Sequence, residues 1–294
     1  MRAALDDALR QECLDALIRC ESRQRDALSK GLWRIALGQM VAADLAAGEH
    51  RTMIGNSAAR RLLADISGGA VDTRAFSSIG LALVLREAKS SHKEVVRFRR
   101  DALATLERLM RKGKGDGATQ QAYATLAGLS GFQRVADVLR TTLEDRNADP
   151  GFRAQSALSL AMLGVGDPGA VRALTAALWD RRSETLRSEA ALALSLLKDA
   201  SFSTPLVREM KKARTERVIA QIALALGRLG EVRSVSPMLA VAEDTEAMDL
   251  TRALAVASVG ILLDPERRPS LFRLSHGAIY AAPTESLLEL FSIL

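Results

Sequence analysis

Residues 164–170 read GVGDPGA and carry the glycine spacing G-x-G-x-x-G, which many nucleotide-binding proteins use to hold a pyrophosphate. That chemistry needs a β-strand before the loop, and after it a helix that leads to a second strand. The residues before the loop, AQSALSLAML, form an Ala- and Leu-rich stretch that favours a helix. We therefore interpret the motif as a joint, in which Gly164 to Gly166 end one helix and Asp167-Pro168 begin the next. No cofactor is expected.

A second candidate for chemistry is the basic segment, residues 86–114, which holds ten Lys and Arg against four Asp and Glu. Its net charge of +6 equals that of the whole chain, so the rest of the sequence is balanced. Such a segment would contact nucleic acid, anionic lipid or an acidic protein, or would be only the solvated outer face of a helix. The candidate patch comprises Lys89, Lys93, Arg97, Arg99, Arg100, Arg108, Arg111, Lys112 and Lys114.

Metal and nucleophile chemistry find no support in the sequence. Cys13 and Cys20 are seven residues apart, two turns of a helix, which is too far for a disulfide; half-buried core positions are expected for both. The histidines are scattered singly, without a Cys, Asp or Glu at ligand spacing. No catalytic, cofactor-binding or metal-binding residue is predicted, and the chain is not expected to be an enzyme.

An internal repeat dominates the sequence. The segments 153-RAQSALSLAMLG, 187-RSEAALALSLLKD, 217-RVIAQIALALGRLG and 252-RALAVASVGILLD share one pattern, in which an apolar column advances by 34, 30 and 35 residues. Weaker copies lie upstream, and about six or seven units are predicted. The apolar column consists of Leu37, Leu81, Leu126, Leu160, Leu194, Leu224 and Val259.

Each repeat is predicted to contain two helices. Segments such as 168-PGAVRALTAALWD have an apolar stripe on one side, which is typical of a half-exposed helix, here the A helix. The repeated segments themselves are apolar on most sides, as expected for a buried B helix. Asp167-Pro168, Thr204-Pro205 and Ser236-Pro237 are predicted to begin A helices, because each places a capping side chain before a proline.

An arginine recurs near the start of the B helices. The start of a helix is electrostatically unfavourable for a cation, so a recurring arginine there predicts a recurring partner. We interpret the column as a structural ladder that pairs with turn carboxylates such as Asp149 and Asp180; a stripe of guanidinium groups that clamps phosphates or carboxylates is the alternative. The ladder comprises Arg74, Arg153, Arg187, Arg217 and Arg252.

The helix pair, its R-x-x-A-x-x-x-L pattern and its 30–35-residue period resemble the HEAT-like repeat family, and most closely the short bacterial form first noted in bilin lyases. The resemblance implies an all-α fold, a right-handed α-solenoid of stacked antiparallel helix pairs. We expect an N-terminal capping helix over 1–29, the repeat array over 30–264, with longer units before 150, and a C-terminal capping segment over 265–294.

The architecture predicts a non-enzymatic scaffold that binds a partner protein on the concave surface formed by the B helices, through polar residues such as Gln155, Ser159, Ser188 and Ser195. The alternative is nucleic-acid binding through the basic segment, including a HEAT-like DNA glycosylase. No apolar run is long enough to span a membrane, and the chain as written is expected to be cytoplasmic; a fragment of a longer or exported protein remains open.

Overall fold

The computed structural model describes residues 9, 12, 13, 15, 16, 19, 26–46, 57–89, 91–113 and 115–263, and in these ranges the fold is all-α, without a strand. The B helices are α2 (Ala27–Ala46), α4 (Val71–Glu87), α6 (Gly117–Ser130), α8 (Pro150–Met162), α10 (Glu184–Leu196), α12 (Glu216–Leu229) and α14 (Asp249–Leu263). The A helices are α3 (Ser57–Gly68), α5 (Lys93–Arg111), α7 (Ala136–Glu144), α9 (Pro168–Leu178), α11 (Ser203–Met210) and α13 (Val235–Glu243). Short 3-10 turns, Gln133–Val135, Ala200–Phe202 and Val232–Ser234, precede α7, α11 and α13.

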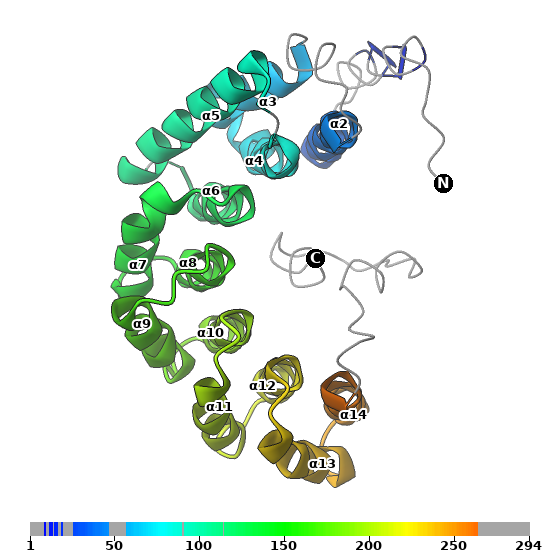
Figure 1. Cartoon of the computed structure of the whole chain (residues 1–294), viewed down its shortest axis with the longest axis vertical. Coiled ribbons are helices and arrows are strands. Elements are labelled where there is room, and N and C mark those ends of the chain that lie inside the picture. The colour runs from blue at the N-terminus through cyan, green and yellow to red at the C-terminus, as the bar shows by residue number, and fades with distance from the viewer. Residues whose placement is uncertain are drawn as a thin grey trace. The chain divides into compact units, whose positions relative to one another are not determined.

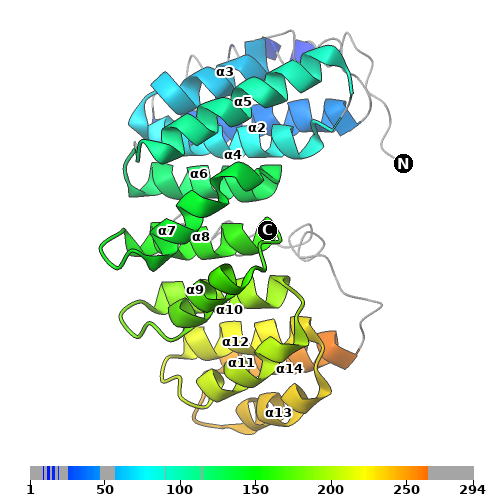
Figure 2. The ribbon, with the colours of Figure 1, turned by 60° about the vertical axis from the view of Figure 1, so that its left-hand side comes forward.

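The chain divides into two compact units, Met1–Leu139 and Arg140–Leu294, and the division falls within α7. In the first unit α2, α4 and α6 pack in succession, and α3 and α5 cover them. In the second unit α8, α10, α12 and α14 form one layer, while α9, α11 and α13 form the other (Figures 1 and 2). Within each unit the helices therefore alternate between two layers, as the helix-pair repeat predicts.

The apolar column lies in the B helices. Its members in α2, α4, α6, α8 and α10 are at most 1% exposed, Val259 is also buried, and Leu224 is half-buried. Every residue of 153–161 and of 186–195 is buried, so α8 and α10 are covered on all sides. These burial patterns confirm the predicted repeat register.

Small residues allow neighbouring B helices to approach closely. A Cβ on Gly38 of α2 would lie 2.3 Å from the carbonyl oxygen of Gly80 in α4. A Cβ on Gly227 of α12 would lie 2.5 Å from the carbonyl oxygen of Ser258 in α14. At both contacts backbone packs directly on backbone, which a larger side chain would prevent.

The GVGDPGA motif is a joint between helices. Gly164, with a φ of +69°, follows the end of α8, and its neighbour Val165 donates a backbone hydrogen bond of 3.1 Å to the carbonyl of Leu160. The Asp167 side chain accepts from the amides of Gly169 and Ala170 at 2.8 and 3.2 Å and so caps α9. The interpretation as a joint is confirmed for the described loop.

Two predicted helix starts are wrong by two residues. The α-helix α11 begins at Ser203, and the 3-10 turn before it is capped by Asp199, which accepts from the amide of Ser201 at 2.8 Å. Helix α13 likewise begins at Val235 after a 3-10 turn. Pro205 and Pro237 therefore stand at the third helical position, where the missing N–H is still one of the donors that a helix leaves free.

Other predictions concern the two ends of the chain. Cys13 is exposed, so its expected half-buried position is wrong; Cys20 lies outside the described residues. The predicted C-terminal capping segment, 265–294, also lies outside them, and the boundaries predicted at 29 and 264 stay predictions. None of the described helices is long and apolar enough to cross a membrane.

Candidate functional site

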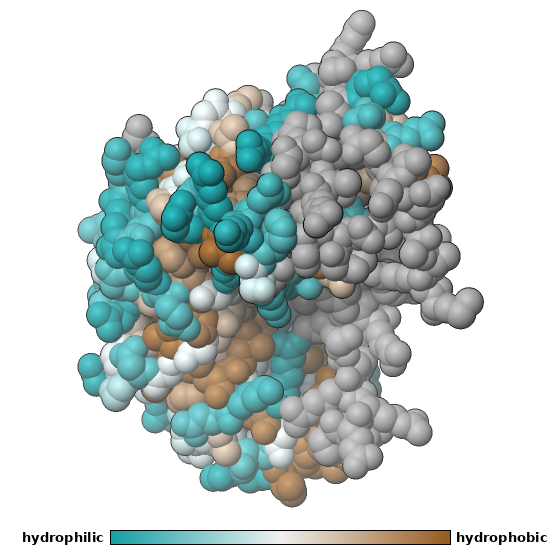
Figure 3. Space-filling view, turned by 45° about the horizontal axis from the view of Figure 1, so that its top comes forward, coloured by the Kyte–Doolittle hydropathy of each residue, from teal (hydrophilic) through white to brown (hydrophobic). Residues whose placement is uncertain are grey.

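The basic segment forms an amphipathic A helix. Val95, Phe98, Ala102, Leu106 and Leu109 recur at helical spacing and are buried in the first unit, where α5 packs against α3 and α6. The basic residues occupy the remaining positions, and Figure 3 shows mostly hydrophilic side chains on the side of its view where α5 lies. The apolar face fixes which basic side chains can meet a partner.

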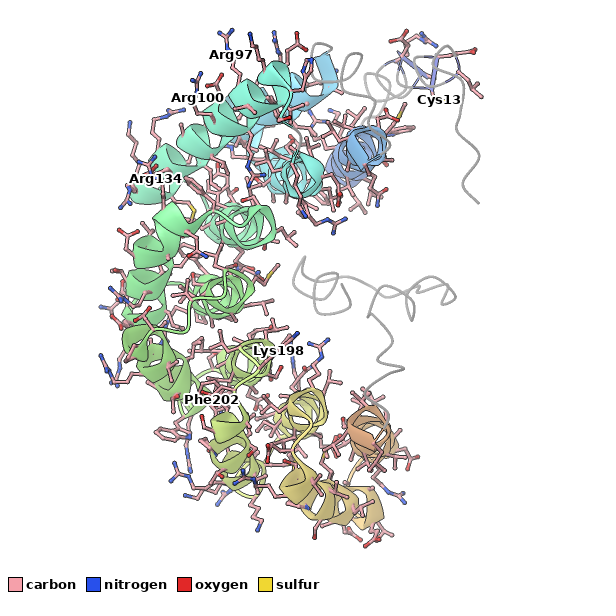
Figure 4. All side chains as sticks on the ribbon, viewed as in Figure 1. Cys13, Arg97, Arg100, Arg134, Lys198 and Phe202 are labelled. Atoms are coloured by element: carbon pink, nitrogen blue, oxygen red, sulfur yellow. The ribbon has the colours of Figure 1, made fainter. Side chains whose placement is uncertain are left out.

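Arg97 and Arg100 are two strongly exposed members of the candidate patch, with 79% and 73% of their side-chain surface accessible. Both approach the same carboxylate, Asp101, at 3.9 and 3.3 Å. Their side chains point away from α4 (Figure 4). Exposed pairs of this kind contribute little to stability, so both guanidinium groups are available to a ligand.

Arg99 and Arg111 have different positions although they belong to the same helix. Arg99 donates to the carbonyls of Leu85 and Ser130 at 2.7 and 2.9 Å, which joins α5 to the ends of α4 and α6. Arg111 donates to Asp137 at 2.9 Å and to Glu107 at 3.2 Å. Its guanidinium lowers the pKa of the Asp137 carboxyl. The structure thus engages both arginines internally.

Of the other predicted members of the patch, four are exposed and one lies outside the residues that the structure describes. Lys89, Lys93, Arg108 and Lys112 are exposed, whereas Lys114 lies outside the described residues. A cavity of about 470 Å³ beside this face is lined by Arg60, Leu63, Glu94, Arg97, Phe98 and Asp101. Two arginines and two carboxylates balance one another there, so acids interrupt the basic surface of α5.

Three of the five ladder arginines bind backbone carbonyls at the ends of A helices. Arg153 donates to the carbonyl of Leu143 at 3.1 Å, and Arg252 donates to that of Ala242 at 3.1 Å, in both cases ten residues earlier. Arg74 donates to the carbonyl of Gly69, just after α3, at 2.8 Å. The C-terminal end of a helix carries partial negative charge and unpaired carbonyls. The start of each of these B helices lies next to the C-terminal end of an A helix. The free carbonyls of that end are the recurring partner of these arginines.

Carboxylates supplement these carbonyls. Arg153 also pairs with Asp180 at 3.1 Å, and the two side chains are 8% and 11% exposed. Arg182 and Arg153 together hold the pKa of Asp180 far below its usual range. Arg187 forms a buried pair with Glu209 of α11. Arg217 is itself exposed, and its charge acts on Glu189 of α10.

The polar B-helix residues expected to meet a partner are buried. Gln155, Ser159, Ser188 and Ser195 are at most 2% exposed, so the prediction that they contact a partner is wrong. Ser195 donates to the carbonyl of Leu192 at 2.7 Å, and the side-chain donors of the other three have no hydrogen-bond partner among the described residues. Small hydroxyl side chains fit between closely packed helices. From the sequence alone, a serine buried in this way cannot be distinguished from a serine on a polar binding surface.

Sequence reasoning missed two features. Arg34 of α2 pairs with Asp65 of α3 at 3.0 Å, a ladder-like contact without a matching sequence pattern. Trp179, which directly follows α9, is 43% exposed, and the guanidinium of Arg208 lies 4.8 Å from the centre of its ring. In the sequence, Trp179 directly precedes the polar turn Asp180-Arg181-Arg182, and this position was the available sign that its ring is exposed. Among the described residues no group of three or more His, Cys, Asp and Glu could hold a metal ion.

The comparison with protein-family models agrees with the repeat architecture. Residues 102–195 match the family model of HEAT repeats. A search of curated proteins finds no match to the chain. Among solved structures, the chain is similar to human deoxyhypusine hydroxylase in complex with glycerol, with a TM-score of 0.40 and 20% identity over 82% of this chain and 81% of that chain.

Proposed function

We propose that this HEAT-repeat chain is a non-enzymatic scaffold that binds a partner protein on the surface of its stacked repeats. The observation that carries the proposal is the succession of helix pairs, whose helices pack on those of the same and of the adjacent repeat and whose turns stay exposed. Stacked repeats create extended binding surfaces of this kind.

The burial of α8 and α10 restricts where the partner would bind. Their polar residues are covered, so within the second unit the candidate contact positions on the B helices lie on α12 and α14, where Arg217, Leu250 and Val256 are exposed. The turns between A and B helices in the second unit are also exposed. We therefore propose that the partner binds α12, α14 and the exposed turns of the second unit. Of these surfaces, only α12 and α14 belong to the B-helix surface that the sequence predicted as the binding site.

Affinity capture with the full chain as bait, followed by reconstitution from purified components, tests the scaffold. The expected result is one protein that binds the purified chain with defined stoichiometry. A chain that stays solitary under these conditions would contradict the proposal.

Nucleic-acid binding is a second candidate, and the exposed guanidinium groups of Arg97 and Arg100 favour it. The informative variant is Arg97→Glu with Arg100→Glu and Arg108→Glu. Arg99 must be kept, because it joins α5 to α4 and α6. We expect binding of duplex DNA by the wild type to weaken steeply with salt and to be lost in the triple variant.

The matched control for this test reverses three charges in the second unit, with Arg172→Glu, Lys198→Glu and Arg233→Glu, all at exposed positions. The control is expected to bind as the wild type does. If wild-type binding is undetectable even at low salt, or if both variants lose it equally, the basic face of α5 is not a nucleic-acid site.

A further inference from the structure

A pocket of about 500 Å³ lies at the turn edge of the second unit, between the turn that joins α7 to α8 and the turn that joins α9 to α10. Its apolar lining comes from Leu143 of α7 and from Ala173, Ala176 and Ala177 of α9. The alanines leave room because they have no side chain beyond Cβ. The pocket is therefore a product of the stacking of two successive repeats.

One wall of the pocket is a fixed ion network. Asp180 accepts from Arg153 at 3.1 Å and from Arg182 at 3.0 and 3.1 Å. Arg153 is in turn held by the carbonyl of Leu143. This single carboxylate faces two guanidinium groups, so the wall keeps a positive charge while its geometry stays defined.

The rim of the pocket carries two further arginines, Arg146 and Arg181. Both are exposed, and the structure gives neither a hydrogen bond nor an ion pair with any described residue. Beside them stands Trp179, whose ring is held by the guanidinium of Arg208 from α11. An exposed indole and two free guanidinium groups around an apolar floor are the features of a binding site rather than of a packing contact.

We propose that this pocket binds an acidic peptide segment of the partner protein, with its carboxylates on Arg146 and Arg181 and an apolar side chain on the alanine floor beside Trp179. The proposal rests on the scaffold function and names the chemistry of its partner. Four arginines and two carboxylates, Asp180 and Glu144, line the pocket, and this charge balance favours a carboxylate ligand.

A nucleic acid is the rival ligand, because the next turn of the same unit adds Lys211, Lys212 and Arg214. Two features favour the peptide. The small apolar floor accommodates an apolar side chain, which a phosphate backbone does not offer, and the pocket is bounded by two turns rather than extended like a groove for a nucleic-acid strand. A single-stranded oligonucleotide therefore belongs in the test as a competitor.

The test measures fluorescence anisotropy of a labelled peptide, Asp-Glu-Leu-Asp-Glu with blocked ends, titrated with the full chain. Its uncharged counterpart, Asn-Gln-Leu-Asn-Gln, and the oligonucleotide serve as probes of class. The wild type is expected to bind the acidic peptide in preference to both. The double variant Arg146→Glu with Arg181→Glu should bind at least about tenfold more weakly, and Trp179→Ala should also weaken binding.

The control variant Arg172→Glu with Arg233→Glu carries the same charge change outside the pocket and is expected to bind as the wild type does. No binding of the acidic peptide, equal loss in both double variants, or preference for the oligonucleotide would each overturn the assignment. If capture finds a partner but the peptide does not bind, the pocket fails and the scaffold stands. If the peptide binds but no partner is found, the scaffold fails and the pocket stands.

Discussion

The guanidinium of Arg153 lies where the end of α7, the start of α8 and the turn after α9 meet. Replacement of Arg153 by Ala leaves a helix-end carbonyl and a nearly buried carboxylate without this donor. We expect Arg153→Ala to lower the free energy of unfolding by about 2–4 kcal/mol. Urea denaturation monitored by circular dichroism measures the change.

Arg252 provides the matched comparison, because it makes the same bond to a carbonyl ten residues earlier. Its carboxylate partner, Asp249, is fully exposed, and Arg252 itself is 36% exposed. Arg252→Ala is therefore expected to cost less than about 1 kcal/mol. Equal losses in the two variants would show that the buried ion network adds nothing to the carbonyl contact.

Glu189 on α10 makes stability depend on pH. Burial raises the pKa of Glu189 to about 7, although nearby Arg217 lowers it, and its Oε2 has no hydrogen-bond partner among the described residues. Since the folded-state pKa lies above the ordinary value of 4.5, the folded state holds this proton more tightly. The free energy of unfolding therefore falls as the pH rises from about 4.5 to about 7.

Glu189→Gln removes this dependence. The variant should be more stable than the wild type at pH 8, by at most about 3 kcal/mol, and equally stable at pH 4. Melting temperatures of both proteins at the two pH values provide the measurement. A difference that is the same at both values would mean that Glu189 does not titrate on unfolding.

At the residue scale, sequence reasoning located the basic helix but not the roles of its members. Arg97, Arg99 and Arg100 are equivalent by charge and lie within four positions. Only the orientation of α5 exposes Arg97 and Arg100 and directs Arg99 to two carbonyls. For four of the five ladder arginines a partner at the adjacent A-helix end is found, as expected for an arginine repeated at an unfavourable helix position, whereas Arg217 forms no hydrogen bond or ion pair with the described residues.

At the scale of the element, close approach of B helices depends on glycine. A Cβ on Gly227 would lie 2.5 Å from the carbonyl oxygen and 2.9 Å from the Cα of Ser258, so α12 and α14 would have to move apart. We expect Gly227→Ala to lower the free energy of unfolding by about 1–3 kcal/mol. Gly260 of α14 has no atom within 4 Å of its virtual Cβ, and Gly260→Ala should raise stability by up to about 1 kcal/mol.

Both glycine variants are compared by urea denaturation under the same conditions. A stabilising Gly227→Ala would show that the two helices adjust without cost. The opposite signs expected for two helix-interior glycines separate packing from helix propensity, since propensity alone favours alanine at both positions.

Sequence patterns predicted these helices better than their ends. The apolar column marks the B helices, because each repeat buries the same position of its B helix and therefore needs an apolar residue there. The starts of α11 and α13 were misplaced because a proline is tolerated throughout the first turn, so its position does not fix the first residue. Asp167 was identified correctly, since its side chain accepts from the first amides of α9.

At the scale of the whole molecule, the repeat predicts an array, but it does not predict where the array divides. The boundary between the two compact units falls within α7, at the transition from longer to shorter repeats. Repeat spacing shows this transition, from about 45 residues to 30–35, yet the sequence contains no linker there. The turn-edge pocket was equally hidden, because it requires residues of two successive repeats to lie together.

The joint at Gly164 and Asp167 has a consequence for how such a chain can change during evolution. At this joint α8 ends before Gly164 and α9 begins with its own cap at Asp167. The length of an A helix is therefore set independently of the B helix beside it. The A helices accordingly range from the 8 residues of α11 to the 19 of α5. We therefore expect insertions of whole turns to be tolerated in the layer of A helices, where a lengthened helix can acquire a new surface while the B helices keep their register.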